Sequence, residues 1–177
     1  MTPDQVADVL GTLASAGVVA IVVVVLLAAL SPARLTSLRT AMAGTGTTLA
    51  AAVAVVATTG SLWFSAGAHF PPCKLCWFQR IAMYPLAVLL PLAAVRADRA
   101  MRFYGLVLAG LGLAVSAWHN AIETFPSLDT GGCDPLNPCT LRWVEGLGVW
   151  TIPRMAFVAF TLVLLALALD APTPEEP

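Results

Sequence analysis

Residues 16–30 read AGVVAIVVVVLLAAL, a run without a single polar side chain. A helix needs about 20 mainly apolar residues to cross the hydrocarbon layer of a membrane. Extended upstream to residue 9, this run forms the first candidate span. Four more segments of comparable length and composition are expected to cross the membrane: residues 43–65, 77–95, 103–122 and 152–169. The sequence therefore predicts an all-α integral membrane protein with five spans.

The composition agrees with a bilayer as the solvent for much of the chain. Of the 177 residues, 59% are hydrophobic and only 11% are charged, whereas a soluble domain carries about a quarter charged residues. The net charge of −1 and the lack of a basic cluster argue against a nucleic-acid partner. The first apolar segment could instead be a signal peptide, but Asp4 and Asp8 give its leading residues the wrong charge for one.

Two arginine-containing connections predict the orientation in the membrane. They cover residues 31–40 (SPARLTSLRT) and 96–102 (RADRAMR), and their cations are Arg34, Arg39, Arg96, Arg99 and Arg102. Because Lys and Arg concentrate in cytoplasmic loops, both connections are expected on the cytoplasmic side of a cell membrane. The N-terminus then lies outside, and residues 170–177 are expected to form a disordered cytoplasmic tail. An odd number of spans places the two termini on opposite sides of the membrane, as this arrangement does.

All four cysteines fall in the two connections that this topology leaves outside the cytoplasm. Cys73 and Cys76 form a CxxC motif that follows two prolines and runs into the third span. At a helix N-terminus, exposed N–H groups and the helix dipole stabilise a thiolate, which is the reactive species in disulfide exchange. Cys133 and Cys139 lie in the turn-rich segment GGCDPLNPC, which can close a short disulfide ring.

Three interpretations of these cysteines compete. Two structural disulfides could staple the outer loops, but a CxxC ring closes too little chain to be an effective staple. Four thiolates could bind zinc, but oxidising surroundings disfavour free thiolates, and the spacing of the second pair is wider than in a usual zinc knuckle. The third interpretation, which we favour, is a redox relay between two dithiol pairs without a metal.

Arg80 lies one helical turn after Cys76 on the same helix face. A charge at the centre of a span costs about 2.5–3.5 kcal/mol and less near the interface, so Arg80 could simply snorkel toward the headgroups. As a functional group, it would be a fixed cation that favours a Cys76 thiolate and an oxyanion forming on a bound acceptor. The aromatic neighbours Trp77, Phe78 and Tyr84 are either interface residues or walls for a flat ring.

The segment CKLCWFQRIAMYP, residues 73–85, resembles the DsbB family and, within it, the Gram-positive branch called BdbC. CxxC is common, but the combination of W, QR and MYP after it is not. The second cysteine pair and the TIP sequence at residues 151–153 add to the resemblance. It implies a DsbB-like four-helix core at residues 43–169, preceded at residues 1–42 by an extra N-terminal transmembrane helix and a cytoplasmic loop. The related vitamin K epoxide reductase family places its loop cysteines before its CxxC, which is the opposite order.

The resemblance also implies an activity, thiol:quinone oxidoreduction. Such a protein reoxidises an extracytoplasmic, DsbA-like thioredoxin-fold oxidase and passes the electrons to a membrane quinone, either ubiquinone or menaquinone. By this resemblance, the catalytic residues are Cys73, Cys76, Cys133, Cys139 and Arg80. The residues expected to contact the quinone are Cys76, Arg80 and His119. Cys133 would be attacked by the partner. The alternative from another class is a non-enzymatic membrane protein with structural disulfides.

Overall fold

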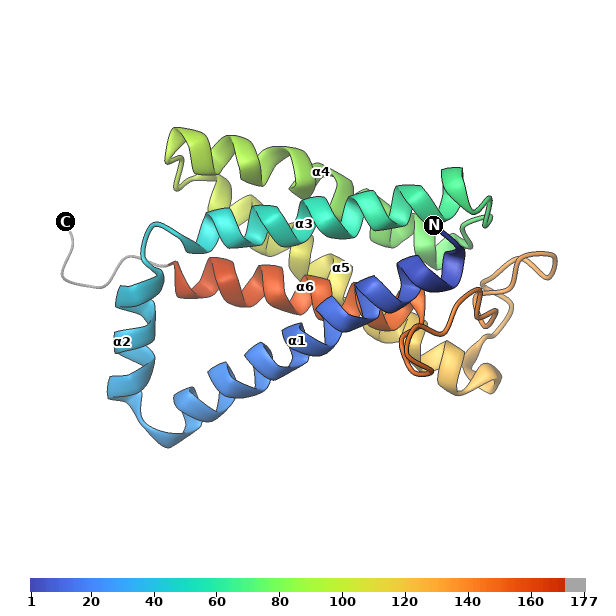
Figure 1. Ribbon diagram of the computed structural model, residues 1–177, viewed down its shortest axis with the longest axis horizontal. Coiled ribbons are helices and arrows are strands. Elements are labelled where there is room, and N and C mark those ends of the chain that lie inside the picture. The colour runs from blue at the N-terminus through green and yellow to red at the C-terminus, as the bar shows by residue number, and fades with distance from the viewer. Residues whose placement is uncertain (171–177) are drawn as a thin grey trace.

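The computed structural model describes residues 1–170, and all its regular structure is helical apart from two isolated β-bridges in the outer loop (Figure 1). Five helices are long and apolar enough to cross a membrane: α1 (Pro3–Leu30), α3 (Gly46–Leu62) together with its π-helical continuation to Gly67, α4 (Lys74–Arg96), α5 (Met101–Thr124) and α6 (Ile152–Leu169). The predicted five-span, all-α architecture is therefore confirmed. Apart from Asp170, the tail predicted at residues 170–177 lies outside the described residues.

Three short elements connect or extend these helices. They are α2 (Pro32–Met42), the π-helix η1 (Trp63–Gly67) that continues α3, and the 3₁₀-helix η2 (Pro126–Leu128). Residues 31–40 were expected as a loop, but nearly all of them belong to α2. Pro32 occupies the first turn of α2, where a proline is tolerated because its missing N–H would have no intrahelical partner. None of the residues of α2 is buried.

Helices α3 to α6 pack around one apolar core. The largest buried side chains there are Leu86 and Leu90 of α4 with Phe160 and Leu167 of α6, while α3 contributes mainly alanines. Small residues let membrane helices approach closely. Gly112 of α5 is one example, because a Cβ at this position would overlap the ring of Phe160.

Helix α1 leans across this bundle instead of joining it as a parallel member. In Figure 1 it crosses α6 near its own N-terminal end and then diverges from α6 toward Leu30. Its buried residues all lie at or before Gly17: Val6, Ala7, Gly11, Ala14 and Gly17. They recur every three to four residues and so form one face. Beyond Gly17, α1 has no buried residue.

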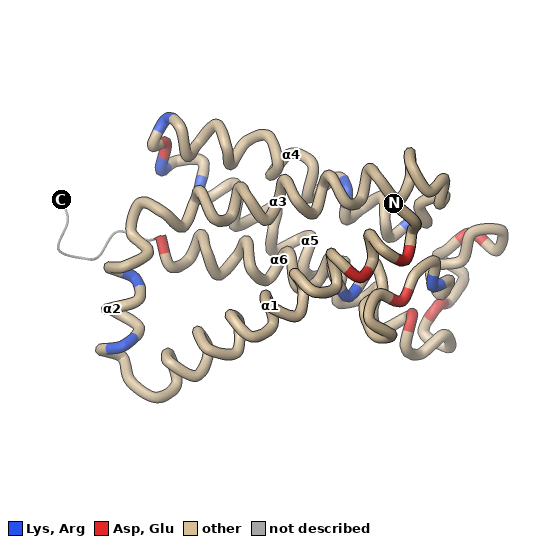
Figure 2. The backbone as a smooth tube through the Cα atoms, in the orientation of Figure 1, with Lys and Arg blue, Asp and Glu red and all other residues tan. Residues whose placement is uncertain are grey.

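Charge is distributed unevenly between the two ends of the bundle. Figure 2 shows the arginines of α2 and of the α4–α5 connection at one end, and most of the described acidic residues at the other. Asp170 is an exception with a structural task, because its carboxylate accepts hydrogen bonds from the backbone N–H groups of Gly44 and Thr47 and so caps the start of α3. The two arginine-containing connections thus share one end, as the topology argument requires.

Candidate active site

The CxxC motif begins helix α4. Cys73 is the N-cap residue, and its Sγ accepts a hydrogen bond from the backbone N–H of Cys76 at 3.3 Å. Both cysteines are free, and their sulfur atoms lie 3.0 Å apart, close enough to share a proton. The hydrogen bond from the Cys76 thiol lowers the pKa of Cys73 to about 4, with further lowering by His119, although burial acts in the opposite direction. A thiolate at Cys73 is thus favoured.

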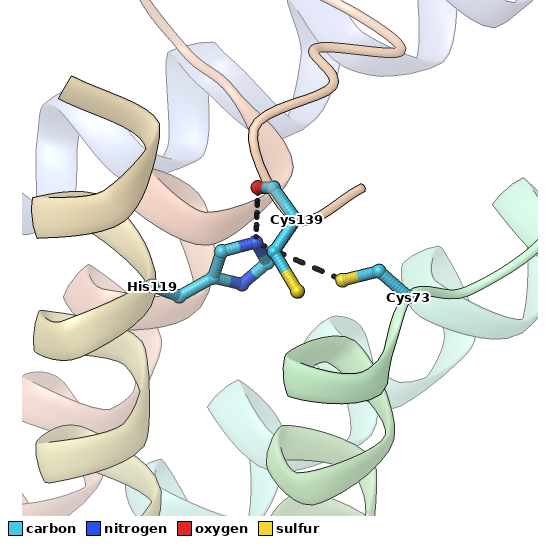
Figure 3. A group of neighbouring side chains, drawn as sticks. All are labelled: Cys73, His119 and Cys139. Atoms are coloured by element: carbon cyan, nitrogen blue, oxygen red, sulfur yellow. Dashed lines mark hydrogen bonds between the residues drawn. The ribbon is translucent and has the colours of Figure 1, made fainter. Parts of the chain in front are cut away.

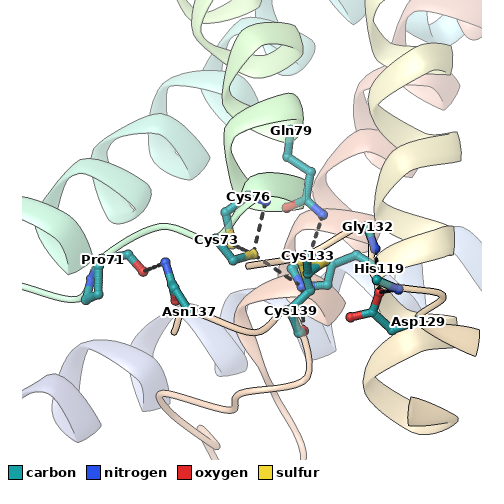
Figure 4. The surroundings of a disulfide bond; sticks show 11 residues. Pro71, Cys73, Cys76, Gln79, His119, Asp129, Gly132, Cys133, Asn137 and Cys139 are labelled. Atoms are coloured by element: carbon teal, nitrogen blue, oxygen red, sulfur yellow. Dashed lines mark hydrogen bonds between the residues drawn. A yellow bond between two sulfur atoms is a disulfide. The ribbon is translucent and has the colours of Figure 1, made fainter. Parts of the chain in front are cut away.

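The second pair is a closed disulfide in the outer loop between α5 and α6 (Figure 4). The Cα atoms of Cys133 and Cys139 lie 5.9 Å apart. Cys139 is buried, whereas Cys133 is partly exposed. The side chain of Asn137, within the disulfide ring, donates a hydrogen bond to the carbonyl oxygen of Pro71, just before the CxxC. The loop disulfide is therefore tied to the start of the segment that carries the other pair.

His119 of α5 lies where the two pairs meet (Figure 3). Its Nε2 is 3.0 Å from the carbonyl oxygen of Cys139 and 3.8 Å from the Sγ of Cys73. On its other side, Nδ1 lies 3.1 Å from the amide nitrogen of Gln79. A histidine that carries its proton on Nε2 satisfies both contacts, donating to the carbonyl and accepting from the amide.

This arrangement brings one sulfur atom of each pair together. The Sγ atoms of Cys73 and Cys139 and a ring nitrogen of His119 all lie within 4.8 Å of one another, and all three residues are buried. These atom types are also ligands of soft metal ions. Because the Cys139 sulfur is bonded to Cys133, however, the group does not offer three free ligands in this state.

An apolar cavity of about 470 Å³ adjoins the CxxC on the membrane side. Its walls come from α1, α3, α4 and α6, and its few polar lining residues include Ser61, Cys76, Gln79, Arg80 and Tyr84. A mostly apolar pocket of this size with a few convergent polar groups is typical of a small-molecule site. Cys76 and Arg80 share this cavity, but His119 does not line it.

Arg80 has partners within the bundle. Its Nε donates to the Oγ of Ser61 at 3.1 Å and its Nη2 donates to the carbonyl oxygen of Ser61 at 3.0 Å. Its guanidinium also lies over the rings of Trp77 and Tyr84, at 5.4 Å and 5.9 Å from their centroids. These contacts compensate a cation inside a span. Tyr84 lines the cavity, while Trp77 and Phe78 are largely exposed on the surface of the helix.

Two residues around the site were not predicted from the sequence, and only the first of them, Gln79, carried a usable signal. Gln79 is buried and links the cavity to His119, and a polar side chain within a span is a functional candidate for the same reason as Arg80. Ser61 of α3 holds Arg80, but a serine in a membrane helix is common and gives little warning.

A third missed residue, Glu123, organises the loop after Cys139. Its carboxylate is almost fully buried and accepts a hydrogen bond from Thr151 Oγ1 at 3.1 Å. Arg142 Nε lies 3.4 Å and Arg154 Nε 3.7 Å from the same oxygen. The network joins the end of α5, the segment just after Cys139 and the start of α6. It therefore restrains the position of Cys139.

The fold and the site together define a multi-pass membrane protein of the thiol–disulfide exchange class. Residues 44–170 match the model of the family described as disulfide bond formation protein DsbB, and the chain belongs to that family. It is thus a disulfide bond formation protein, which implies oxidoreductase activity. Helices α1 and α2 lie outside the matched residues.

Curated relatives agree with this membership. The chain is 36% identical over 118 residues to disulfide bond formation protein C of Bacillus subtilis, covering 66% of this chain and 86% of the relative. It is 41% identical over 135 residues to a probable disulfide formation protein of Deinococcus radiodurans, covering 68% and 84%. A probable disulfide formation protein of Oceanobacillus iheyensis is 37% identical over 114 residues, covering 63% and 79%. No solved structure gives a significant match.

Proposed function

We propose that this protein is a thiol:quinone oxidoreductase that reoxidises an extracytoplasmic, DsbA-like thioredoxin-fold oxidase. The proposal is supported by the spatial order of the four sulfur atoms, which runs from the outer loop to the cavity. The Cys133–Cys139 disulfide is followed by Cys73 within 4.8 Å of Cys139, and Cys73 is followed by Cys76 at 3.0 Å, on the cavity wall. Electrons taken from a partner at the surface then have a continuous path into the membrane.

The partly exposed Cys133 is the sulfur that a partner thiolate attacks, because Cys139 is buried. The attack forms a mixed disulfide with Cys133 and releases Cys139 as a thiolate. The second thiol of the partner then attacks the mixed disulfide, so that the partner leaves oxidised and the loop pair is reduced. Two electrons have entered the loop pair at this point.

The next exchange begins with a Cys73–Cys76 disulfide. The Cys139 thiolate attacks Cys73, and Cys76 leaves as a thiolate that faces the cavity. Cys133 then attacks Cys139 and displaces Cys73. Cys73 is a good leaving group because the pKa of its thiol is lowered to about 4, and a thiol of low pKa leaves faster. The products are a closed loop disulfide and a reduced CxxC, the same pairing as in the described structure.

The cavity residues fit a quinone, either ubiquinone or menaquinone. The walls are apolar, as a ring with an isoprenoid tail requires, and Arg80 directs only some of its five N–H donors at Ser61. Arg80 and Tyr84 would hold the ring with Cys76 beside it. When bound, the quinone would accept two electrons and two protons. Cys73 and Cys76 would thereby return from the reduced state to the disulfide.

The proposal includes an orientation. Arginines of α2 and of the α4–α5 connection would face the cytoplasm, and both cysteine pairs would face outward. Disulfides persist on that side of a cell membrane. Residues 43–169 would be the catalytic core, and residues 1–42 an addition to it.

The test uses detergent-purified protein, a reduced thioredoxin-fold oxidase and a short-chain benzoquinone. We expect the partner to be oxidised with one quinone reduced per disulfide formed, and we expect quinone to be extracted from the purified protein. Oxidation of the partner that stopped after one equivalent, with no quinone consumed, would contradict the proposal.

A further inference from the structure

We infer that α1, which lies outside the family match, forms the wall that closes the acceptor cavity, and that Ala16 and Ala20 set the size of the quinone that reaches Cys76. The inference rests on the proposed function, because it names a specificity determinant of the same cavity. It also gives a role to a helix that a four-helix core does not need.

Helix α1 supplies one wall of the cavity. Six residues of α1 border it: Leu10, Leu13, Ala14, Ala16, Gly17 and Ala20. They face small and branched residues of α3 across the cavity, among them Ala52, Val53 and Val56. Since none of these six side chains has a hydrogen-bonding group, α1 can select a ligand only by shape.

Helix α1 is also anchored to the outer loop by its N-terminal half. Asp8 Oδ1 accepts a hydrogen bond from the backbone N–H of Leu147 at 2.8 Å, and Trp150 Nε1 donates to Ser15 Oγ at 2.8 Å. Gly146 packs directly against the carbonyl of Ala7, where a Cβ would overlap the α1 backbone. All three partners belong to the loop between Cys139 and α6. The wall is thus tied to the loop of the outer cysteine pair.

The close packing of α1 against the bundle ends at Gly17, its last buried residue. A Cβ at Gly17 would come within 2.8 Å of Leu162 Cδ1 and 3.0 Å of Val158 Cγ1, so α1 touches α6 at this point. Ala20 is the last residue of α1 that lines the cavity, and α1 has no buried residue beyond Gly17. The C-terminal part of α1 diverges from α6 (Figure 1). The inner limit of the cavity wall is therefore the turn from Ala16 to Ala20.

Ala16 and Ala20 are suited to a test because neither is buried in the packed part of α1. They lie four residues apart on one face, and both are exposed and border the cavity, so a phenylalanine at either position adds bulk at the edge of the cavity. Val19 is the matched control. It is 63% exposed on the same turn and does not line the cavity.

The experiment compares Ala16→Phe, Ala20→Phe and Val19→Phe with the unsubstituted protein. We expect Ala16→Phe and Ala20→Phe to raise the KM for a short-chain naphthoquinone by about tenfold and to raise the KM for the smaller benzoquinone by less. The reason is that a phenylalanine side chain in the cavity takes up space that the larger ring needs. Quinone retained through purification should fall in parallel. Oxidation of the partner by quinone-depleted protein in a single turnover should be unchanged, and Val19→Phe should match the unsubstituted protein.

Ala16→Phe and Ala20→Phe variants that retained quinone as well as Val19→Phe, with an unchanged KM for both rings, would overturn the inference and leave the proposed function standing. A parent protein that neither retained nor reduced quinone would overturn both. The two failures are thus distinguishable.

Discussion

The Sγ atoms of Cys73 and Cys139 lie within 4.8 Å of each other, with His119 beside both. Cys73 caps α4, whereas Cys139 belongs to the loop before α6, so the bundle and the loop network together create this proximity. Disulfide exchange needs direct approach of one sulfur to another. A small displacement of Cys139 toward Cys73 would therefore suffice to form a disulfide between the two pairs.

The roles of the two loop cysteines lead to the first prediction. Cys139→Ser should accumulate a mixed disulfide between Cys133 and the partner. It forms when the free Cys133 thiolate attacks the disulfide of the oxidised partner and releases the partner's second thiolate, and Cys139 is no longer present to close the loop and expel the partner. Cys133→Ser should not accumulate this adduct. Non-reducing gels of cells that express each variant with the partner provide the measurement. An adduct that persisted in Cys133→Ser but disappeared in Cys73→Ser would make the CxxC the partner-facing pair.

The low pKa of Cys73 leads to a pH prediction. The thiolate exists above the pKa, so alkylation of Cys73 in the reduced protein should stay nearly constant from about pH 8 to pH 5 and fall only near pH 4. An ordinary thiol loses about tenfold in rate per pH unit below about 8.5. Cys76→Ala removes the hydrogen bond that lowers the pKa most and should move the fall in rate toward neutral pH. Mass spectrometry of the alkylated protein measures both profiles. A tenfold loss per unit in the unsubstituted protein would contradict the assignment.

Arg80 is predicted to take part in quinone binding and not in disulfide exchange with the partner. Arg80→Ala should raise the KM for quinone by about tenfold or more, the loss expected for a charged hydrogen-bond donor. Exchange between the partner and the loop pair should change by less than about twofold, since Arg80 lines the cavity and not the outer loop. Lys74→Ala, which removes an exposed cation at the start of the same helix, is the matched control. Activity that merely followed the amount of protein in the membrane would assign Arg80 a structural role.

Glu123 is predicted to position Cys139. Glu123→Ala leaves Arg142, Arg154 and Thr151 without their shared acceptor and should destabilise the outer loop by about 1–3 kcal/mol. Glu145→Ala removes only the exposed partner of Arg142 and is the control. Formation of a Cys73–Cys139 bond in a Cys76→Ser background should slow in Glu123→Ala, while capture of the partner at Cys133 stays unchanged. Equal slowing of both reactions would indicate a general loss of structure.

The membrane topology is predicted from arginine placement, and labelling tests it. After reduction of whole cells, a membrane-impermeant maleimide should modify Cys133 first, because Cys139 is 1% exposed. A cysteine introduced at the exposed Ser37 of α2 should react only in inverted vesicles. The opposite pattern would reverse the orientation and place the relay in the cytoplasm.

The secondary structure was largely predictable, with instructive exceptions. In lipid every backbone polar group must be paired within the chain, so a long apolar run has to be a helix, and α6 begins and ends where its hydropathy does. Residues 31–40 were expected as a loop because arginines marked them as non-spanning. Polarity excludes a span but does not exclude a helix, and α2 forms there.

What the sequence by itself determined is local: the five spans, the CxxC at a helix start, the second pair in a turn-rich loop and the offset of Arg80 from Cys76. Only the tertiary structure decided that Arg80 is held by Ser61, that His119 lies beside Cys73 and Cys139 and not on the cavity wall, and that residues of α1 line the cavity. The reason is that neighbours across a bundle depend on how each helix is rotated about its axis. In water, polar and apolar faces reveal that rotation, but in a membrane the lipid-facing and protein-facing sides are equally apolar, and packing alone selects it.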